Sequence, residues 1–245
     1  MSTINRRTIR KYSDKEVSLS LLREITEEAM HAPTTGNMQL YSVVATYDTA
    51  IKEQLAPAHF RQPQITGCAV ALTVCADFNR FVKWCEQRCA VPGYDNLQSL
   101  TTACLDAAIF AQALVEAAEK RGLGTCYLGT TTYNAPQIAS MLGLPARVVP
   151  VTTITVGYPA EEGVDCGRLP VDAVLHIDKY HDYAAADIDR LYAEKEARAD
   201  SMRFIAENGK QTLAQVFTDV RYAKAANEEF SNVLADFIRK QYPME

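Results

Sequence analysis

The stretch from Leu97 to Arg121 limits the possible folds of this chain more than any other segment. It contains no glycine or proline, is rich in alanine, and stops at Gly122, so it predicts one long α-helix. Its apolar side chains surround most of the helix circumference, and they include Leu105, Ala108, Ile109, Leu114, Val115 and Ala118, with Gln112 on the same surface. A helix of this kind normally lies at the centre of a domain or between two neighbours.

The remaining periodicities predict strands and shorter helices around that helix. The expected strands are Tyr41–Thr46, Cys68–Ala76, Thr125–Leu128 and Val148–Val156. The expected helices run from Ser18 or Ser20 to about His31, over Thr49–Leu55 and Phe78–Val91, and from Asn134 to Met141–Gly143, with a loop at Phe60–Gln64. From Ala184 onward we expect two amphipathic helices separated near Asn208-Gly209. Since no repeat or linker divides the chain, these patterns predict one α+β domain over residues 1–245, with residues 184–245 as a helical C-terminal extension.

Composition excludes several classes of function. A net charge of −5 and a pI near 5.5 argue against a general nucleic-acid binder. We expect no membrane span, since the apolar run Cys68–Ala76 stops at Asp77, and no signal peptide, since Arg6 and Arg7 interrupt the N-terminus. The seven cysteines are odd in number and lack zinc-binding spacing, so we expect free thiols, no metal site and a cytoplasmic location.

The segment Arg6–Tyr12, with the sequence RRTIRKY, concentrates positive charge close to the N-terminus. In an extended conformation Arg6, Thr8 and Arg10 share one face, because successive side chains alternate. Guanidinium groups bind phosphate in bidentate fashion and stay charged at any relevant pH. Taken alone, the segment fits either a phosphate clamp or a solvated basic tail.

Later motifs favour the clamp, because together with RRTIRKY they resemble the flavin-dependent nitroreductase family. The opening resembles that family's R-R-S-x-R-x-[FY] motif. The other matching segments follow in family order: Ala32–Gln39 (APTTGNMQ), Cys75–Arg80 (CADFNR), Gly122-Leu123-Gly124 with Tyr127-Leu128-Gly129, Leu142–Pro145 (LGLP), Val156–Pro159 (VGYP) and Arg168-Leu169-Pro170. The CADFNR segment is similar to the NADPH-dependent, oxygen-insensitive nitroreductase and flavin reductase branch.

The resemblance implies a nitroreductase-like fold, a central mixed sheet flanked by helices, that binds FMN non-covalently. The implied phosphate-binding residues are Arg6, Arg10 and Arg168, and Arg7 and Thr8 are further implied cofactor-binding residues. The residues implied around the flavin ring are Thr34, Thr35, Asn37 and Gln62, with the backbone of Tyr127, Leu128 and Gly129. Two alternatives stay open: Thr35 and its neighbours fit a turn after Pro33, and Arg168 alone fits a surface charge. Cys166 stands where this branch often has a lysine, so one phosphate cation is missing or is replaced by Arg6.

The implied activity is an FMN-dependent NAD(P)H oxidoreductase that reduces nitroaromatics, quinones or free flavins by successive hydride transfers. No protein acid or nucleophile is required, so we assign no catalytic side chain. Alternatives are an FMN-binding sensor or store without turnover, another reaction of this fold such as dehalogenation, and an anion-binding scaffold without flavin. We expect NADPH to serve at least as well as NADH, although Arg203 and Lys210 are the only hints of a site for its extra phosphate.

We also expect a homodimer with FMN at the subunit interface, in which the C-terminal extension packs on the partner. The long central helix is apolar on more faces than one thin layer can cover. The expected helix Gln211–Gln241 likewise needs a surface to cover its apolar face, formed by Val216, Val220, Phe230 and Phe237.

Overall fold

The computed structural model describes residues 6–242, which form two compact units. Residues 6–164 and 230–242 form the first unit, and residues 165–229 form the second. The first unit contains every strand of the described sheet, whereas the second consists of helices and connecting loops. Each unit is described separately below.

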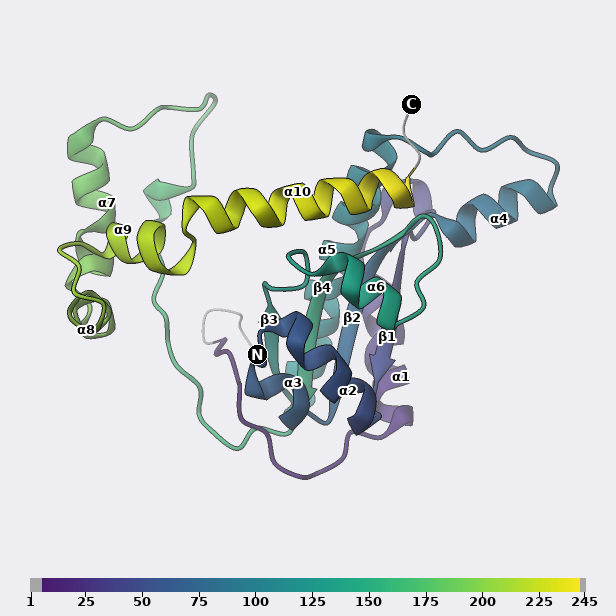
Figure 1. The fold of residues 1–245 in the computed structure, drawn as a ribbon, viewed down its shortest axis with the longest axis horizontal. Helices are drawn as coiled ribbons and strands as arrows, with labels where there is room; N and C mark the ends of the chain where they lie inside the picture. Colours follow the sequence, from purple (N-terminus) through teal and green to yellow (C-terminus); the bar gives the residue numbers. More distant parts are fainter. Residues whose placement is uncertain (1–5, 243–245) are drawn as a thin grey trace. The chain divides into compact units, whose positions relative to one another are not determined.

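The sheet of the first unit has four strands in the order β1-β2-β4-β3 (Figure 1). The strands are β1 (Tyr41–Thr46), β2 (Val70–Asp77), β3 (Gly124–Leu128) and β4 (Val148–Gly157). All three pairings among the described strands are antiparallel, with an irregularity at Val74/Cys75. The α+β class is confirmed, but in place of the expected mixed sheet the described strands form an antiparallel one. β2 is buried throughout because helices cover both of its faces, and that burial does not require parallel neighbours.

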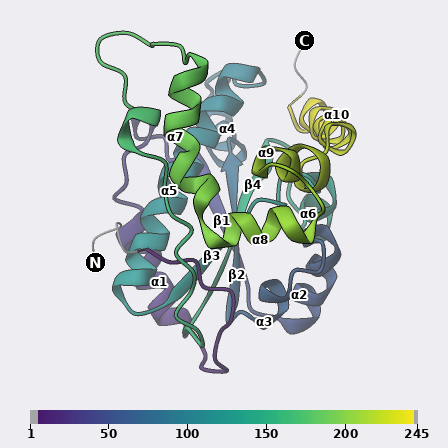
Figure 2. The same cartoon turned by 90° about the vertical axis from the view of Figure 1, so that its left-hand side faces the viewer.

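Helices cover both faces of this sheet, as the edge-on view in Figure 2 shows. One face carries α1 (Leu19–Ala29) and α5 (Leu97–Lys120), and the other carries α2 (Thr49–Leu55), α3 (Pro63–Gly67) and α6 (Ala135–Met141). Alternate residues of β2 divide between the two cores: Leu72 packs in the α1/α5 core, and Ala71 packs with Cys126 and Leu128 on the other face. The prediction of α5 as a central core helix is therefore confirmed.

Short elements join these layers and refine the predicted boundaries. They are η2 (Thr35–Asn37), η3 (Ala56–His59) and α4 (Asn79–Gln87). Ser18 caps α1 by accepting a hydrogen bond from the backbone N–H of Leu21, as its position predicts. The loop expected at Phe60–Gln64 is shorter, because Pro63 already starts α3 and Gln62 is its N-cap residue.

The C-terminal region is more broken than expected. Its elements are η4 (Val171–Ala173), α7 (Ala185–Ala197), α8 (Ala199–Glu207), α9 (Leu213–Val216), the π-helical turn η5 (Phe217–Arg221) and α10 (Lys224–Gln241). The expectation of two helices is thus wrong. Arg198 adopts an extended conformation between α7 and α8, and the π-helical turn separates α9 from α10.

The last part of α10 packs within the first unit. Phe230 stacks on Tyr133 with ring centroids 4.7 Å apart, and Phe237 is buried. The Tyr242 hydroxyl donates a hydrogen bond to the carbonyl of Arg147 over 3.0 Å. The expectation of a partner surface is therefore wrong for Phe237, which its own chain buries, whereas Phe230 stacks on Tyr133 and stays partly exposed.

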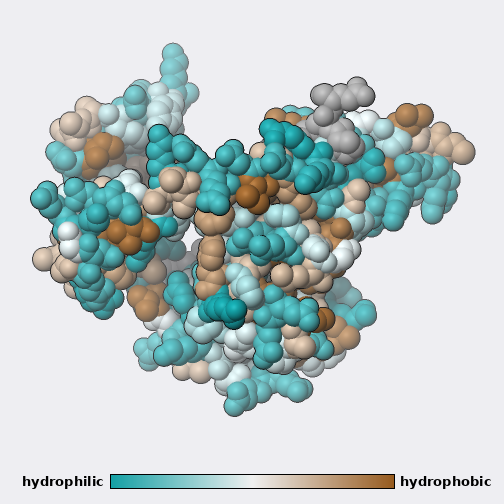
Figure 3. All heavy atoms as spheres, in the orientation of Figure 1, coloured by the Kyte–Doolittle hydropathy of each residue, from teal (hydrophilic) through white to brown (hydrophobic). Residues whose placement is uncertain are grey.

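One face of α5 remains uncovered within the single chain. Leu105 is 59% exposed and Ile109, one turn later, is 42% exposed. Figure 3 shows that apolar residues on the visible surface form separate patches among mostly polar side chains. By length and composition alone, α5 is long and apolar enough to cross a membrane. Half of this apolar stretch is buried, however, and the core helix of a soluble protein can have the same length and composition.

Candidate functional site

The N-terminal arm, residues 6–12, is fixed against the edge of the sheet at β3 and β4. The backbone N–H of Ile9 donates to the carbonyl of Thr125 over 3.0 Å. The Ile9 side chain occupies the space where a Cβ on Gly124 would lie, 2.7 Å from Ile9 Cβ. The Tyr12 ring lies in the same way on Gly157, and its hydroxyl lies 2.7 Å from the Thr155 hydroxyl. Two glycines thus let the arm dock closely, so its arginines extend from a held backbone rather than from a loose tail.

The three arginines of the arm differ in their surroundings. The Arg6 guanidinium is 3.2 Å from a Glu119 carboxylate oxygen and donates to the Thr125 hydroxyl over 3.1 Å. Arg7 and Arg10 are exposed, and neither guanidinium has a hydrogen-bond or ion-pair partner among the described residues. The expected set of Arg6, Thr8 and Arg10 on one free face is therefore not seen, because Arg6 is already paired with a carboxylate. Thr8 forms a backbone bridge with Val164.

Glu161 fixes the backbone around Arg10 while leaving its side chain free. One carboxylate oxygen accepts the backbone N–H of Arg10 over 2.7 Å and that of Lys11 over 3.1 Å. These bonds, chiefly the one from Arg10, lower the pKa of the Glu161 carboxyl. The Arg10 guanidinium thus projects from a backbone that is held on both sides.

The end of β3 provides an open backbone surface. Leu128 is buried, and the Tyr127 hydroxyl donates to the side-chain oxygen of Gln112 over 3.3 Å. Gly129 is exposed, and a Cβ built on it would meet no atom within 4 Å. Its φ is not in the left-handed region, so neither conformation nor packing within this chain explains a glycine here. Open space beside a bare backbone suits the close approach of a flat ligand.

The segment from His59 to Gln64 lies beside the same end of β3. His59 Nδ1 lies 2.9 Å from the Thr130 hydroxyl, which ties this segment to the residue after Gly129. The side-chain N–H of Gln64 donates to the side-chain oxygen of Gln62 over 2.8 Å, which orients the Gln62 amide. Burial lowers the pKa of His59 to about 4, so its imidazole is neutral near pH 7.

The loop that carries Thr34, Thr35 and Asn37 is held by Asp106 of α5. One Asp106 oxygen accepts the Thr35 backbone N–H over 2.9 Å and the Thr35 hydroxyl over 3.1 Å, and the other accepts the Leu40 N–H over 3.3 Å. Asn37 has a positive φ, and its side-chain oxygen has only a 3.4 Å contact with the Gln39 amide. The Thr35 hydroxyl therefore helps to build the loop, whereas the Thr34 and Asn37 side chains remain at its surface.

The two groups of candidate residues are anchored at two separate points of α5, one near its middle and one at its C-terminal end. Thr35 is tied to Asp106, and Arg6 is tied to Glu119, thirteen residues later. At 1.5 Å per residue these anchors lie about 20 Å apart along the helix. One chain thus brings the arm, Gln62 and the end of β3 together, but it does not bring the Thr34–Asn37 loop to the arm.

Arg168 belongs to the second unit, where it is exposed and donates to the carbonyl of Gly167 over 2.6 Å. Arg198 holds this turn by donating to the carbonyl of Asp165 over 2.7 Å, while its other side pairs with Asp200 at 3.1 Å. Gly167 has a φ of 62°, and a Cβ on it would lie 2.7 Å from an Arg198 nitrogen. A cavity of about 200 Å³ at this turn is lined by Cys166, Gly167, Arg168, Leu169, Glu194, Lys195 and Arg198. Lys195 and Arg198 thus supply positive charge beside Cys166.

Sequence reasoning missed several residues that organise these segments, among them Asp106, His59 and Arg198. Asp106 is the only charged residue between Leu97 and Val115, and an isolated carboxylate in an apolar helix could have signalled a buried anchor. His59 and Arg198 gave no such signal, because their partners Thr130 and Asp165 lie far away in sequence.

Comparisons with known proteins agree with this architecture. The model of the nitroreductase family matches residues 4–158. An FMN reductase [NAD(P)H] of Bacillus subtilis is 32% identical over 181 residues, 73% of each chain. An NADPH-dependent oxidoreductase of Staphylococcus aureus is 30% identical over 220 residues, 85% of this chain and 84% of that one. A protein of known structure from Bacteroides fragilis is 52% identical, with a TM-score of 0.98 and full coverage of both chains. With the motifs in order and the family model spanning more than half of the sequence, the chain belongs to the nitroreductase family.

Proposed function

We propose that this protein is an FMN-dependent NAD(P)H oxidoreductase that reduces nitroaromatics, quinones or free flavins. The observation that carries the proposal is the pair of free guanidiniums, Arg7 and Arg10, on an arm docked beside β3, whose end leaves open space at Gly129. This arrangement fits a ligand with a phosphate at one end and a flat ring at the other. The related FMN reductase [NAD(P)H] of B. subtilis supports FMN and NAD(P)H, and the related NADPH-dependent oxidoreductase of S. aureus supports NADPH. FMN, when bound, supplies hydride transfer from the nicotinamide to the acceptor.

The residues of this chain bind and orient the cofactor. Arg7, Arg10 and Arg168 are proposed to hold the phosphate, with the Thr8 hydroxyl beside them and Arg6 bracing the arm against Glu119. Gln62, oriented by Gln64, presents amide hydrogen-bonding groups to the ring edge. The backbone of Tyr127, Leu128 and Gly129 lines the ring. We assign no proton donor: the one buried histidine in this region, His59, is neutral near pH 7 and has no exposed surface.

We further propose that the active protein is a homodimer whose two chains share each site. The separation of about 20 Å between the anchors of the arm and of the Thr34–Asn37 loop supports this, because a second copy can bring its own loop to the arm. The uncovered face of α5 at Leu105 and Ile109 supports it as well. In this proposal the part of the C-terminal extension outside the first unit, residues 184–229, packs on the partner, and Thr34, Thr35 and Asn37 reach the flavin of the partner.

Subunit mixing tests the shared site. Arg10→Ala removes a phosphate cation, and Asn37→Gly removes a ring contact while keeping a residue that tolerates positive φ. If each site uses Arg10 of one chain and Asn37 of the other, a heterodimer of the two variants holds one site with both residues intact. Each heterodimer should then bind FMN at one of its two sites, so random mixing of equal amounts should restore about a quarter of all sites. If mixing restores nothing although both variants fold and dimerise, each site is built from one chain.

Turnover is tested with the purified protein. Steady-state oxidation of NADPH in the presence of menadione or nitrofurazone distinguishes the oxidoreductase from an FMN sensor or store. A colourless protein that shows no spectral change with added FMN would instead support the anion-binding scaffold. We propose that NADPH serves at least as well as NADH, which the ratio of the two kcat/KM values decides. We also propose a cytoplasmic location, which suits the reduced thiols of Cys68, Cys75, Cys85, Cys89, Cys104 and Cys126.

A further inference from the structure

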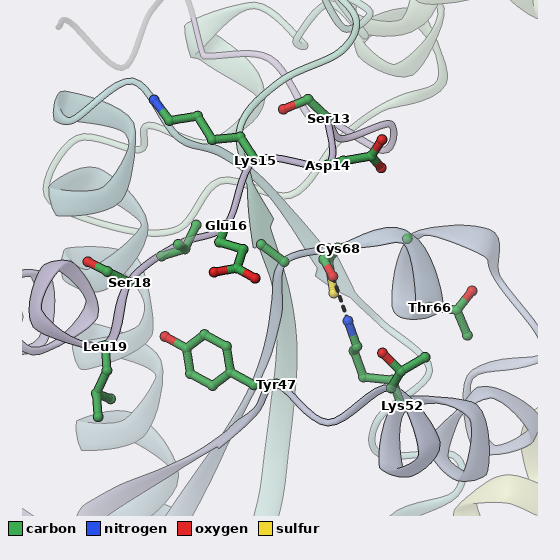
Figure 4. A pocket seen from close by; sticks show the side chains of 14 residues that line it. Ser13, Asp14, Lys15, Glu16, Ser18, Leu19, Tyr47, Lys52, Thr66 and Cys68 are labelled. Atoms are coloured by element: carbon green, nitrogen blue, oxygen red, sulfur yellow. Dashed lines mark hydrogen bonds between the residues drawn. The ribbon is translucent and has the colours of Figure 1, made fainter.

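A second cavity in the first unit is lined by none of the residues proposed to bind FMN. Its volume is about 670 Å³, within the range of small-molecule sites, and it opens between the end of β1, helix α2 and the start of β2 (Figure 4). Its lining residues are Ser13, Asp14, Lys15, Glu16, Val17, Ser18, Leu19, Tyr47, Thr49, Lys52, Thr66, Gly67, Cys68 and Ala69. Most of the side chains are polar, so the cavity suits a hydrophilic ligand.

Lys52 is the unusual member of this lining, because it is a buried cation without a counter-charge. It is only 5% exposed, and its ammonium donates to the carbonyl of Cys68 over 2.7 Å. Among the described residues no carboxylate lies within 4.0 Å of Lys52 Nζ. An ammonium has three donors, and a buried charge is unfavourable unless it is paired. Two donors of Lys52 are therefore available for an anionic group in the cavity.

Glu16 supplies the opposite charge on the other side of the cavity. Figure 4 shows the Glu16 carboxylate and the Lys52 ammonium approaching the middle of the pocket from two sides, with the Tyr47 ring below. Neither Glu16 nor the Tyr47 hydroxyl has a side-chain hydrogen bond within the described chain. Burial raises the pKa of Tyr47, so its hydroxyl stays protonated and can donate. Lys15 is different, because its ammonium lies 3.8 Å from the centre of the Tyr158 ring and is already engaged.

We propose that this cavity binds a small amino-carboxylate, a molecule with one carboxylate and one ammonium group. The carboxylate accepts the two remaining N–H groups of Lys52, and the ammonium meets the Glu16 carboxylate. A simple anion satisfies Lys52 but is repelled by Glu16, and a simple cation meets the reverse problem. The amphoteric ligand is the one class that complements both charges at once.

Ligand-observed NMR titration of the purified protein tests the proposal with three probes: 4-aminobutanoate, acetate and methylammonium. We expect 4-aminobutanoate to bind at least tenfold more tightly than either single-charge probe. Lys52→Met should weaken 4-aminobutanoate at least tenfold. Glu16→Gln should weaken 4-aminobutanoate but not acetate. Lys15→Met is the matched control, since Lys15 also lines the cavity but is engaged with Tyr158, and it should change affinity less than twofold.

The proposal fails if 4-aminobutanoate does not bind, if acetate binds equally well, or if Lys52→Met leaves the affinity unchanged. If Lys52→Met does not fold, Lys52→Arg provides the test, because it keeps the charge but moves the donors. A change of less than twofold in 4-aminobutanoate affinity in the arginine variant would then overturn the assignment. NADPH oxidation by each variant reports independently on the proposed flavin site.

Discussion

Two carboxylates of α5, Asp106 and Glu119, hold segments of the candidate site, and they differ in burial. That difference determines how strongly each carboxylate stabilises the segment that it binds. Asp106 is 1% exposed and accepts two backbone N–H groups and a hydroxyl. Glu119 is about one-fifth exposed and binds two side chains, those of Arg6 and Thr125. A buried carboxylate must have all its partners in place, whereas a partly exposed one can exchange a partner for water. The Thr34–Asn37 loop is therefore tied to a fully buried anchor, whereas the arm depends less on Glu119 because packing on Gly124 and Gly157 and backbone hydrogen bonds also hold it.

Removing the buried anchor should have the largest effect. Asp106→Ala leaves the N–H groups of Thr35 and Leu40 and one hydroxyl without their acceptor, and it should cost about 4 kcal/mol of unfolding free energy. Asp106→Asn keeps one acceptor oxygen and should cost less than the alanine variant. Denaturant unfolding of both variants measures this. A loss below about 1 kcal/mol for Asp106→Ala would show that the loop does not depend on this residue.

The sequence could predict the layers of the fold but not these anchors. Periodicity located all four strands and α5, because burial on a sheet or helix face leaves a local pattern. It could not reveal that Asp106 reaches Thr35 or that Glu119 holds Arg6, since each pair depends on the folded geometry. The alternation of side chains along RRTIRKY likewise predicted that Arg6 and Arg10 share one free face. In the structure Ile9 and Tyr12 dock on the sheet, and Arg6 pairs with the Glu119 carboxylate. The resemblance provided the site residues, but no local pattern told which of them a single chain brings together.

A second buried polar contact, between His59 and Thr130, should make stability depend on pH. The folded pKa of His59 is about 4 and its ordinary value is 6.5, so the unfolded chain binds more protons between these values. The contribution is fully present above pH 6.5 and is lost as the pH falls toward 4, by about 3 kcal/mol in total. Urea unfolding from pH 4 to 7 measures it. In His59→Gln, which lacks the titrating group, this part of the slope should disappear.

The arm should matter for binding rather than for folding, in contrast to Asp106. Arg10→Ala should weaken FMN by about 2 kcal/mol, the scale of one charge-assisted hydrogen bond, with little change in stability because the guanidinium has no partner among the described residues. Flavin fluorescence titration at moderate salt gives the dissociation constant. Lys11→Ala, at the exposed neighbouring position, is the control and should change affinity only slightly. Equal losses in both variants would indicate a general charge effect and not a clamp.

Substitution of Arg198 tests whether the second unit also contains a residue that holds an FMN-binding segment in position, as Asp106 and Glu119 of α5 do in the first unit. Because Arg198 holds the Asp165 carbonyl and packs on Gly167, Arg198→Ala should free the Arg168 turn and weaken FMN by about 1 kcal/mol. kcat at saturating FMN should not change. The double variant Arg168→Ala/Arg198→Ala should bind no more weakly than Arg168→Ala alone, since Arg198 acts through Arg168. Arg190→Ala, which breaks exposed ion pairs of α7, is the matched control and should have no effect on FMN.

The smallest effect on unfolding free energy is expected for substitution of the partly exposed Glu119, near the C-terminal end of α5. Glu119→Gln removes the charge but keeps an amide oxygen that can accept from Arg6 and Thr125, so unfolding free energy should fall by only about 0.5 kcal/mol. The loss of unfolding free energy should be smaller still in high salt, because solvent reaches the Arg6–Glu119 pair and salt screens it.

The same variant, Glu119→Gln, also decides the role of Arg6. If Arg6 only braces the arm, FMN affinity should stay within twofold of wild type, since Ile9 and Tyr12 still dock on Gly124 and Gly157. If instead Glu119 and the phosphate of FMN compete for Arg6, neutralising Glu119 frees Arg6 to bind the phosphate. FMN should then bind more tightly. A loss of unfolding free energy above about 2 kcal/mol in Glu119→Gln would show that Glu119 stabilises the fold to an extent similar to Asp106. The difference drawn between the two carboxylates would then be wrong.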